Sequence, residues 1–373
     1  MEKINVLFIE INNKGGSYFS LVDMIKSLGD SIHPIVLFPW KNDAYHELHS
    51  MGVECLAIHY TRTLLNCSFW GYLYSLPRYS YSYFVSDRRC VQRVVDYFKG
   101  RKVHVVHTNT SDPIVGVDLA RKLNAKHVWH TREQIDLVNH ILWGTCWLRR
   151  KKNHADARIL ISQPLIESWG LKKDNTFVIG NAVRSINDAM IDENKDKYIL
   201  FCSASLSKRK GVDFLVEAFA MSQLWKSGYQ LYLIGKCDEE MNKLLHVITE
   251  KYNITEHVKY LGKIDDIKPY YMKASLYVMA SESEGLSRTA IEAMFYGCPV
   301  LAHMVGGTTD FIFEGETGYF YQNMNECVAK MKQIVSEDQN SVIQKAQQYV
   351  MDHYSIENYG SKILDVYQKV LKV

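Results

Sequence analysis

Short apolar runs of strand length alternate with segments of helical period in the first half of the chain. This alternation limits the possible folds more than any other feature. The runs are 6–11, 34–38, 103–107, 126–130 and 157–161. After the first run come Gly15-Gly16 and then a helical pattern over 20–28. Strands separated by helices indicate βαβ units and a mostly parallel sheet.

The alternation breaks over residues 184–197, where seven of fourteen residues are charged, and then resumes. The runs of the second series are 198–202, 229–234, 257–261, 276–280 and 299–302. A helical tail over 340–373 has a break near Tyr354-Ser355. At ~150 residues per domain, 373 residues allow two domains. We expect doubly wound α/β domains over 1–183 and 198–353, a solvated linker over 184–197 and a final helix over 354–373.

The composition argues against several classes of protein. Lys and Arg number 44 against 41 Asp and Glu, a net charge of +3, which is too balanced to indicate a nucleic-acid binder. The eight cysteines are scattered without C-x-x-C spacing, so we expect a reducing cytosol and neither a disulfide framework nor a zinc ribbon. Glu2 and Glu10 flank the first apolar run, which therefore does not resemble a signal peptide.

The chain lacks the motifs of several common nucleotide and metal sites. Neither G-x-G-x-x-G nor G-x-x-x-x-G-K-S/T occurs, which argues against nicotinamide and P-loop enzymes. No D-x-D pair is present, although many sugar transferases bind a metal ion with one. The pairs His104/His107 and His127/His130 have no carboxylate or cysteine cluster beside them, so we expect no metal site.

The strongest motif reads E-G-L-S-R-T-A-I-E-A-M over residues 284–294, followed by G-C-P-V over 297–300. Gly285 allows the backbone to approach a ligand, and Ser287 is placed to cap a helix whose free N–H groups suit a phosphate. Glu284 and Glu292 are suited to accept hydrogen bonds from the hydroxyl groups of a sugar and a ribose. The segment therefore predicts a site for a phosphate beside polyhydroxyl groups.

This E-x7-E arrangement with its flanking motifs resembles the signature of retaining glycosyltransferases of the GT-B fold, glycosyltransferase family 4 (glycosyl transferases group 1). The resemblance is dense over residues 198–321, and sparse but ordered over 6–183. It implies two Rossmann-like domains facing across a cleft, with a C-terminal helix that crosses back onto the first domain. For an isolated E-x7-E, an ordinary surface helix is the alternative.

The basic loop 207–211 follows the first strand of the second series and resembles the Lys-Gly loop of this family. The matching residue is Lys210, and the resemblance implies that it grips the donor diphosphate. The family usually has Gly-Arg-Leu upstream, whereas this chain has Ser205 in place of the arginine. Lys208 and Arg209 are the candidates to replace that charge. A merely solvated basic loop is the alternative.

Two elements of the first domain also resemble the family. Gly15-Gly16 matches its glycine loop near the donor phosphates, with a plain turn as the alternative. His130, in H-T-R-E, matches a histidine that lies beside the donor sugar, with a structural histidine as the alternative. Asn181 resembles part of a hinge element, although its neighbours differ from the family pattern.

The resemblance implies retaining transfer of a sugar from a nucleoside diphosphate to an acceptor hydroxyl, with neither a metal ion nor another cofactor. The implied catalytic residues are Glu284, Lys210 and His130. The implied donor-binding residues are Gly15, Gly16, Ser205, Arg209, Lys210, Gly285, Leu286, Ser287 and Glu292. The acceptor implied by the family's common uses is a lipid-linked or growing glycan in bacterial surface polysaccharide synthesis.

Two segments combine aromatic and basic residues. Residues 60–84 hold six tyrosines, and residues 143–152 hold Trp147 and four consecutive basic residues ending at Lys152. Such segments suit an anionic membrane surface or stacking against sugars. We therefore hypothesise a cytoplasmic enzyme that is peripheral on the inner face of a membrane. The alternative is a helical hairpin packed on its own core, with a solvated basic edge.

Three other functions compete with transfer. Ser205 favours a non-catalytic nucleotide-sugar binder, and a nucleotide-sugar isomerase would need no acceptor. A glycoside hydrolase would place Glu284 and Glu292 across the scissile bond at ~5–9.5 Å. One of these carboxylates precedes the expected helix and the other lies along it, which disfavours the hydrolase.

Overall fold

The chain divides into two compact units, which are described separately. A computed structural model describes residues 3–65, 69–133, 140–141 and 144–372. The first unit comprises Met1–Ala182 with Ile356–Val373, and the second comprises Val183–Ser355. The ends of the second unit lie close to the expected positions 183 and 353, and segment 184–197, expected as a linker, is grouped with this unit.

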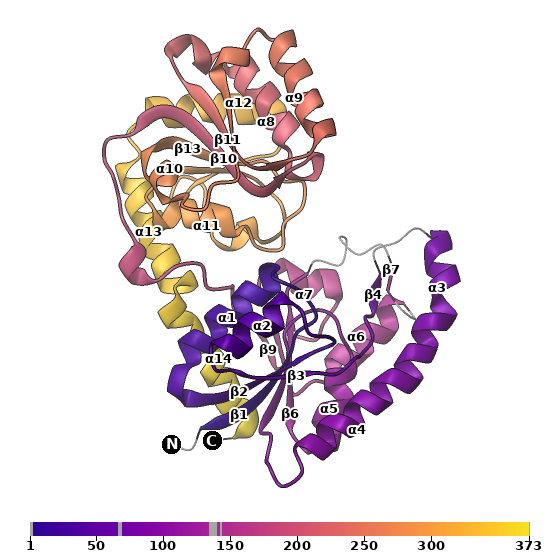
Figure 1. Ribbon diagram of the computed structural model, residues 1–373. Coiled ribbons are helices and arrows are strands. Elements are labelled where there is room, and N and C mark those ends of the chain that lie inside the picture. Colours follow the sequence, from indigo (N-terminus) through magenta and orange to yellow (C-terminus); the bar gives the residue numbers. More distant parts are fainter. Residues whose placement is uncertain (1–2, 66–68, 134–139, 142–143, 373) are drawn as a thin grey trace. The chain divides into compact units, whose positions relative to one another are not determined.

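The first unit is built on a seven-stranded parallel sheet in the order β3-β2-β1-β5-β6-β8-β9 (Figure 1). The strands are β1 Ile4–Ile9, β2 Ile32–Phe38, β3 Glu54–Ala57, β5 Val105–Thr108, β6 Lys126–Thr131, β8 Ala157–Leu160 and β9 Thr176–Val178. The strand order reverses between β1 and β5. In sheets of this type, ligands bind at such a reversal, beyond the carboxyl ends of the strands.

Helices cover both faces of this sheet. They are α1 Gly16–Leu28, α2 Asp43–Ser50, α4 Arg88–Tyr97, α5 Val115–Leu123, α6 Thr145–Asn153, α7 Pro164–Trp169 and α14 Ile356–Leu371. One apolar core joins the sheet to α1 and α14, and a second joins it to α4 and α5. A short antiparallel ribbon pairs β4 Leu64–Leu65 with β7 His140–Ile141.

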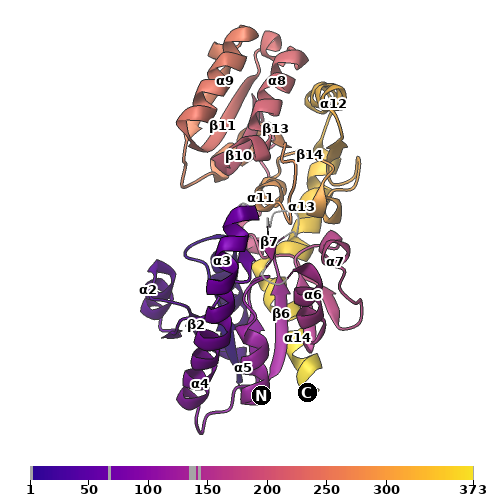
Figure 2. The ribbon, with the colours of Figure 1, turned by 90° about the vertical axis from the view of Figure 1, so that its right-hand side faces the viewer.

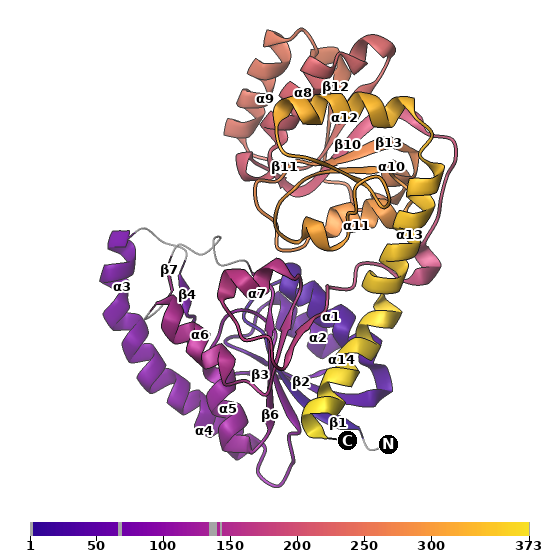
Figure 3. The same cartoon turned by 180° about the vertical axis from the view of Figure 1, so that it is seen from behind.

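The C-terminal helix α14 packs on the first unit, as expected, and lies along α1 (Figure 3). Gly360 allows the two helices to approach closely, since a Cβ there would lie 2.6 Å from the carbonyl oxygen of Ser27. The face of α14 that is buried carries Tyr359, Ile363 and Tyr367. The expected helix break is also present, because α13 ends at Tyr354 and α14 begins at Ile356.

The second unit has a six-stranded parallel sheet in the order β12-β11-β10-β13-β14-β15. Its strands are β10 Asp196–Leu206, β11 Gln230–Cys237, β12 Val258–Gly262, β13 Ala274–Met279, β14 Val300–His303 and β15 Tyr319–Tyr321. Its helices are α8 Val212–Ser222, α9 Glu239–Lys251, α10 Lys268–Lys273, α11 Arg288–Phe295, α12 Met324–Ser336 and α13 Asn340–Tyr354. Here the strand order reverses between β10 and β13, which places the loops after these strands at the expected ligand position.

The two sheets confirm the expected α/β class, and every predicted run overlaps an observed strand. The strands that the pattern missed in these sheets are β3, β9 and β15, which are short and lie at sheet edges. A short edge strand buries little side-chain surface, so its apolar signal is weak. Among the described residues, no helix has the length and apolarity needed to span a membrane.

Candidate active site

In the second unit, the basic loop and the E-x7-E loop meet at the sheet reversal. The backbone at Gly211 has a φ of 69° and lies against the end of β13, where a Cβ would come 2.0 Å from the carbonyl oxygen of Ala280. A side chain cannot be accommodated there, so the close approach requires the glycine of the Lys-Gly sequence. The backbone N–H of Glu282 donates to the carbonyl oxygen of Arg209 at 3.1 Å, which joins the two loops.

Lys210 and Glu284 form an ion pair across these loops. Both side chains are largely buried, with 20% and 14% of their surface exposed. The Oγ of Ser281 also donates to Glu284, at 2.8 Å, and the N–H of Gly307 donates to its backbone carbonyl at 3.1 Å. The pair therefore places an ammonium group and a carboxylate side by side at the carboxyl ends of β10 and β13, both fixed by neighbouring loops.

Ser287 caps α11, as expected. Its Oγ accepts a hydrogen bond from the backbone N–H of Ala290 at 3.4 Å. Gly285 is half-buried and leaves the backbone before the helix accessible, whereas Leu286 is buried and contributes to packing. The positive end of α11 thus lies next to the Lys210–Glu284 pair, a combination that suits an anion.

Glu292 lies on α11 and has two partners. Its Oε1 pairs with the guanidinium of Arg184 at 3.0 Å, and the Tyr271 hydroxyl donates to its Oε2 at 3.4 Å. Burial raises the pKa of Glu292, and the charge of Arg184 opposes that rise. The two partners leave part of the hydrogen-bonding capacity of the carboxylate unused, as a site for ligand hydroxyls requires.

Segment 184–197 is largely exposed, as its charge suggested, but two of its basic side chains have specific partners. Arg184 lies beside Glu292, and Lys195 donates to the backbone carbonyls of Met272 and Gly297, each at 2.7 Å. Hydrogen bonds to carbonyls and an ion pair compensate the partial burial of these charges. A count of charged residues cannot reveal such partners, because they come from distant parts of the chain.

Ser205, Lys208 and Arg209 are all exposed. Ser205 follows an irregularity in β10 and pairs in register with Lys236 of β11. The side chains of Lys208 and Arg209 are therefore accessible at the same edge as Lys210, but within the described part of the chain neither forms a hydrogen bond or ion pair with Lys210 or Glu284. Their part in donor binding stays a prediction.

In the first unit, a buried polar cluster follows the carboxyl ends of β1, β5 and β6. Glu10 is fully buried, and its carboxylate accepts hydrogen bonds from the backbone N–H groups of Ile11 and Asn12 at 3.0 and 2.9 Å. Ser17 and Asn109 donate to the same carboxylate. Burial raises the pKa of Glu10 in spite of these bonds. Glu10 thereby holds the loop that leads to Gly15 and Gly16.

Neither Gly15 nor Gly16 is required by the packing. A Cβ at Gly16 would have no atom within 4 Å, and one at Gly15 would meet only ordinary contacts. No side chain caps α1, which begins at Gly16. The glycines therefore leave the start of this helix open at the backbone, and their place near the donor phosphates stays a prediction.

Arg132 connects the members of the cluster. Its guanidinium donates to the backbone carbonyl and side-chain oxygen of Asn109, at 2.9 and 2.8 Å, and also to Asn181 and to the Tyr359 hydroxyl. Asn181, expected only as a hinge residue, thus belongs to this network. Sequence reasoning singled out neither Arg132 nor Glu10 nor Asn109 as site residues. The sequence feature that could have identified these three residues is that each of them directly follows a strand.

The protonation of His130 can be deduced from its neighbours. Its Nδ1 lies 3.3 Å from the guanidinium of Arg132, which can only donate, so Nδ1 is the acceptor and the proton resides on Nε2. Burial and the charge of Arg132 hold the pKa of His130 well below its ordinary value. Among the described residues, His130 Nε2 has no hydrogen-bond partner. His130 is therefore a neutral imidazole with one unused N–H donor.

The two aromatic-basic segments come together on the first unit. Residues 69–97 form one continuous helical stretch, in which α3 Phe69–Ser82 is followed by a π-helical turn, Tyr83–Asp87, and then by α4 (Figure 2). Tyr83 packs edge-on against Trp147 of α6, with ring centroids 6.1 Å apart. No described residue of α3 is fully buried, although residues 71, 72, 75, 76, 79 and 80 are half-buried. The alternative of a hairpin packed on its own core therefore stays a prediction for this helix. Residues 66–68, 142 and Trp143 lie outside the described residues.

Lys152 corrects the expectation of a uniformly solvated basic edge. It is fully buried, and its Nζ donates to the Thr131 hydroxyl at 2.8 Å and lies over the rings of Trp129 and Trp169. Burial lowers its pKa to about 7. Lys152 is thus part of the core and cannot contribute charge to a surface.

Comparison with known proteins agrees with these two units. The family of glycosyl transferases group 1 matches residues 183–350. An uncharacterized glycosyltransferase of Methanocaldococcus jannaschii is 24% identical over 267 residues, which are 69% of this chain and 72% of that protein. The lipopolysaccharide core biosynthesis glycosyltransferase LpsE of Rhizobium meliloti is 27% identical over 144 residues, 39% of this chain and 41% of that protein.

The fold has solved counterparts over its full length. The crystal structure of HepE from Anabaena in complex with UDP is similar with a TM-score of 0.81 and 19% identity, covering 98% of this chain and 100% of that one. At this identity the likeness shows the fold, and it extends through both sheets and α14. Residues 183–350 thus resemble the group 1 glycosyl transferases, and the chain has the GT-B fold.

Proposed function

We propose that this protein is a retaining hexosyltransferase of glycosyltransferase family 4. In this proposal it moves a sugar from a nucleoside-diphosphate donor to a hydroxyl of a lipid-linked or growing glycan, in the synthesis of a bacterial surface polysaccharide. The observation that carries the proposal is the ion pair between Lys210 and Glu284 beside the capped start of α11. The match to group 1 glycosyl transferases supports the nucleotide-sugar donor.

The proposed chemistry is electrostatic. As the sugar leaves with positive charge, negative charge accumulates on the diphosphate, and Lys210 with the N–H groups at the start of α11 is placed to stabilise it. A bound diphosphate would compete with Glu284 for Lys210, leaving the Glu284 carboxylate free for sugar hydroxyls or for the developing positive charge. We propose that Glu292 holds the ribose and that His130 donates its Nε2 proton in a hydrogen bond to the donor sugar.

We propose that transfer needs no metal ion, because Lys210 and the helix start supply the positive charge. Transfer that is undiminished by a chelator would support this, and transfer restored only by a divalent cation would contradict it. The HepE structures hold UDP and UDP-glucose, which makes uridine nucleotides the first donors to test.

A second candidate is a nucleotide-sugar binding protein without transfer. The observation that favours it is Ser205, an exposed serine where the family usually has an arginine. This candidate would be supported if the protein bound the donor but released no sugar from it, whichever acceptor glycan was added. Conversion of the donor sugar without an acceptor would instead support an isomerase.

The test of the proposed function is donor binding followed by product analysis. We expect one nucleoside-diphosphate sugar to raise the melting temperature, and the anomeric configuration to be kept in the product. Lys210→Ala should abolish the shift. No shift with any nucleotide sugar would contradict the proposal.

We also propose that the protein works at the cytoplasmic face of a membrane, bound to an anionic lipid surface. The exposed aromatic residues of α3 support this proposal. Flotation with anionic vesicles tests it, and the absence of binding would contradict it.

A further inference from the structure

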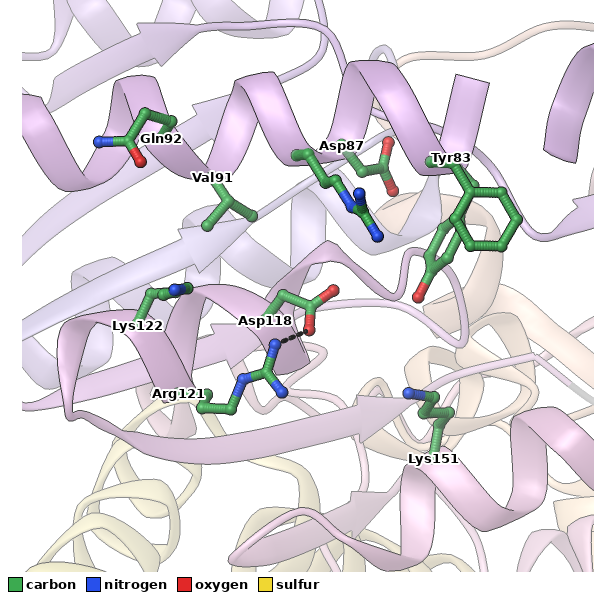
Figure 4. A pocket seen from close by; sticks show the side chains of 10 residues that line it. Tyr83, Asp87, Val91, Gln92, Asp118, Arg121, Lys122 and Lys151 are labelled. Atoms are coloured by element: carbon green, nitrogen blue, oxygen red, sulfur yellow. Dashed lines mark hydrogen bonds and ion pairs between the residues drawn. The ribbon is translucent and has the colours of Figure 1, made fainter. Parts of the chain in front are cut away.

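A cavity of about 480 Å³ lies in the first unit, apart from the cluster at the strand ends. It is bounded by the π-helical turn and α4 on one side and by α5 and α6 on the other (Figure 4). Figure 4 shows Asp87 and Val91 on the upper helix, Asp118 and Arg121 on the lower one, and Lys151 on a third element. The volume lies in the ordinary range of small-molecule sites, and none of the residues proposed for transfer lines it.

The charge of the cavity is positive. Its lining contains four basic residues, Arg88, Arg121, Lys122 and Lys151, against Asp87 and Asp118. Arg121 donates to Asp118 at 3.1 Å, which neutralises both. Within the described part of the chain, none of the other three basic residues forms an ion pair with a carboxylate. Cations arranged in this way around a cavity suit an anionic group such as a phosphate.

Asp87 adds a second, independent sign of a ligand. Only 3% of its surface is exposed, and its Oδ1 accepts a hydrogen bond from the backbone N–H of Thr61 at 2.8 Å. Its Oδ2 has no hydrogen-bond partner in the described residues. Buried polar atoms in folded proteins nearly always have a partner, so this oxygen needs a hydrogen-bond donor from outside the described residues, and a ligand hydroxyl can supply one.

The surroundings of the cavity are aromatic and exposed. Tyr83 and Phe84 line it, and they directly follow α3 in the continuous helical stretch. Along α3, Trp70, Tyr74 and Tyr81 are 78%, 91% and 68% exposed, at a spacing that places them on one side of a helix. Exposed aromatic residues beside cations are typical of a surface that enters the interfacial layer of a membrane.

We propose that this cavity binds the headgroup of an anionic phospholipid, with its phosphate between Arg88, Lys122 and Lys151 and a headgroup hydroxyl on Asp87. α3 then lies in the interfacial layer next to the bound lipid. The inference deepens the proposed membrane partner and is independent of the donor chemistry. It predicts preference for a lipid that is both anionic and hydroxylated, such as phosphatidylglycerol.

The experiment is flotation of the full chain with phosphatidylcholine vesicles that contain phosphatidylglycerol, phosphatidic acid or neither. We expect binding to phosphatidylglycerol, weaker binding to phosphatidic acid and none to phosphatidylcholine alone. Lys122→Glu with Lys151→Glu should weaken binding to phosphatidylglycerol at least tenfold. The matched control, Lys332→Glu with Lys345→Glu, makes the same change in net charge at exposed positions of the second unit and should bind as the wild type does.

The outcomes separate this inference from the proposed function. The melting-temperature shift with the nucleotide sugar reports donor binding and folding, and it should be the same in the cavity variant as in the wild type. If the cavity and control variants lost vesicle binding equally, the change in net charge alone would explain the loss. That result would overturn the proposed lipid site in the cavity. If the protein bound free glycerol phosphate but no vesicles, the ligand of the cavity would be a soluble molecule. That result would contradict the proposal that the cavity binds a lipid headgroup. Equal binding to phosphatidic acid and phosphatidylglycerol would overturn the role of Asp87.

Discussion

The charged groups at the two sheet reversals are organised differently. In the second unit they form separate pairs, Lys210 with Glu284 and Arg184 with Glu292, which are partly exposed. In the first unit, Arg132 and Glu10 are buried in one network that also includes Asn109. A pair can exchange one partner for a ligand at modest cost, whereas a buried network cannot lose a member without leaving polar groups unpaired. We therefore expect the ion pairs of the second unit to exchange partners with a ligand, and the buried network of the first unit to hold its side chains rigidly in place.

The largest expected effect concerns the stability of the first unit. Arg132→Met leaves acceptors of Asn109, Asn181 and Tyr359 without their donor, and we expect the free energy of unfolding to fall by about 3 kcal/mol or more. Denaturant titration measures it. The matched control is Arg101→Met, which breaks an exposed pair with Glu54 and should cost below about 1 kcal/mol. Equal effects of the two substitutions would show that the buried network of the first unit is no costlier to break than an exposed ion pair.

The corresponding change in the second unit should affect activity and leave stability nearly unchanged. Lys210→Ala removes the cation proposed to stabilise the leaving diphosphate, and we expect kcat to fall by about 100- to 1,000-fold. Steady-state assays of sugar transfer measure it, with the exposed Lys345→Ala as control. A variant that retains full kcat would show that Lys210 is only a structural partner of Glu284.

The buried histidines of the first unit contribute one part of the pH dependence of stability, and the raised pKa values of Glu10 and Asp87 contribute another part of opposite sign. Burial lowers the pKa values of His107, His127 and His130, that of His127 to about 4. Since the unfolded chain binds these protons more readily than the folded one, their contribution to stability is complete above pH 6.5 and is lost as the pH falls. For His127 alone the loss between pH 6.5 and about 4 is at most about 3 kcal/mol.

Denaturant titrations across this pH range test the sign. His127→Gln should lose less stability than the wild type as the pH falls, whereas the exposed His246→Gln should lose as much as the wild type. A His127→Gln variant that loses as much stability as the wild type would contradict the lowered pKa of His127.

The smallest expected effect concerns the second carboxylate of the motif. Glu292→Gln keeps the shape of the side chain but removes the charge that pairs with Arg184 and is proposed to bind the ribose. We expect the KM for the donor to rise about tenfold with kcat little changed, which corresponds to ~1.4 kcal/mol. Glu326→Gln, on the exposed start of α12, serves as the control. An unchanged KM would restrict Glu292 to a structural role.

Much of the fold followed from the sequence, because the buried strands of parallel sheets are apolar runs between helices. The E-x7-E helix was also predictable, since Gly285, Ser287 and the two glutamates are local in the chain. Arg184 was missed because its partner Glu292 is more than a hundred residues away. The Arg132 network was missed for the same reason: strand ends can be predicted one by one, but their side-chain bonds depend on sheet order. Lys152 was taken as solvated because a basic run does not reveal which member points inward.

Titration with nucleotides tests the ligand-exchange role of the second unit most directly. Calorimetry with UDP, GDP, ADP and CMP and their sugars would compare the wild type with Lys210→Ala and Arg132→Met. We predict binding of one nucleotide, loss of that binding in Lys210→Ala, and its retention in Arg132→Met below the melting temperature of that variant. Undiminished binding in Lys210→Ala would contradict the account.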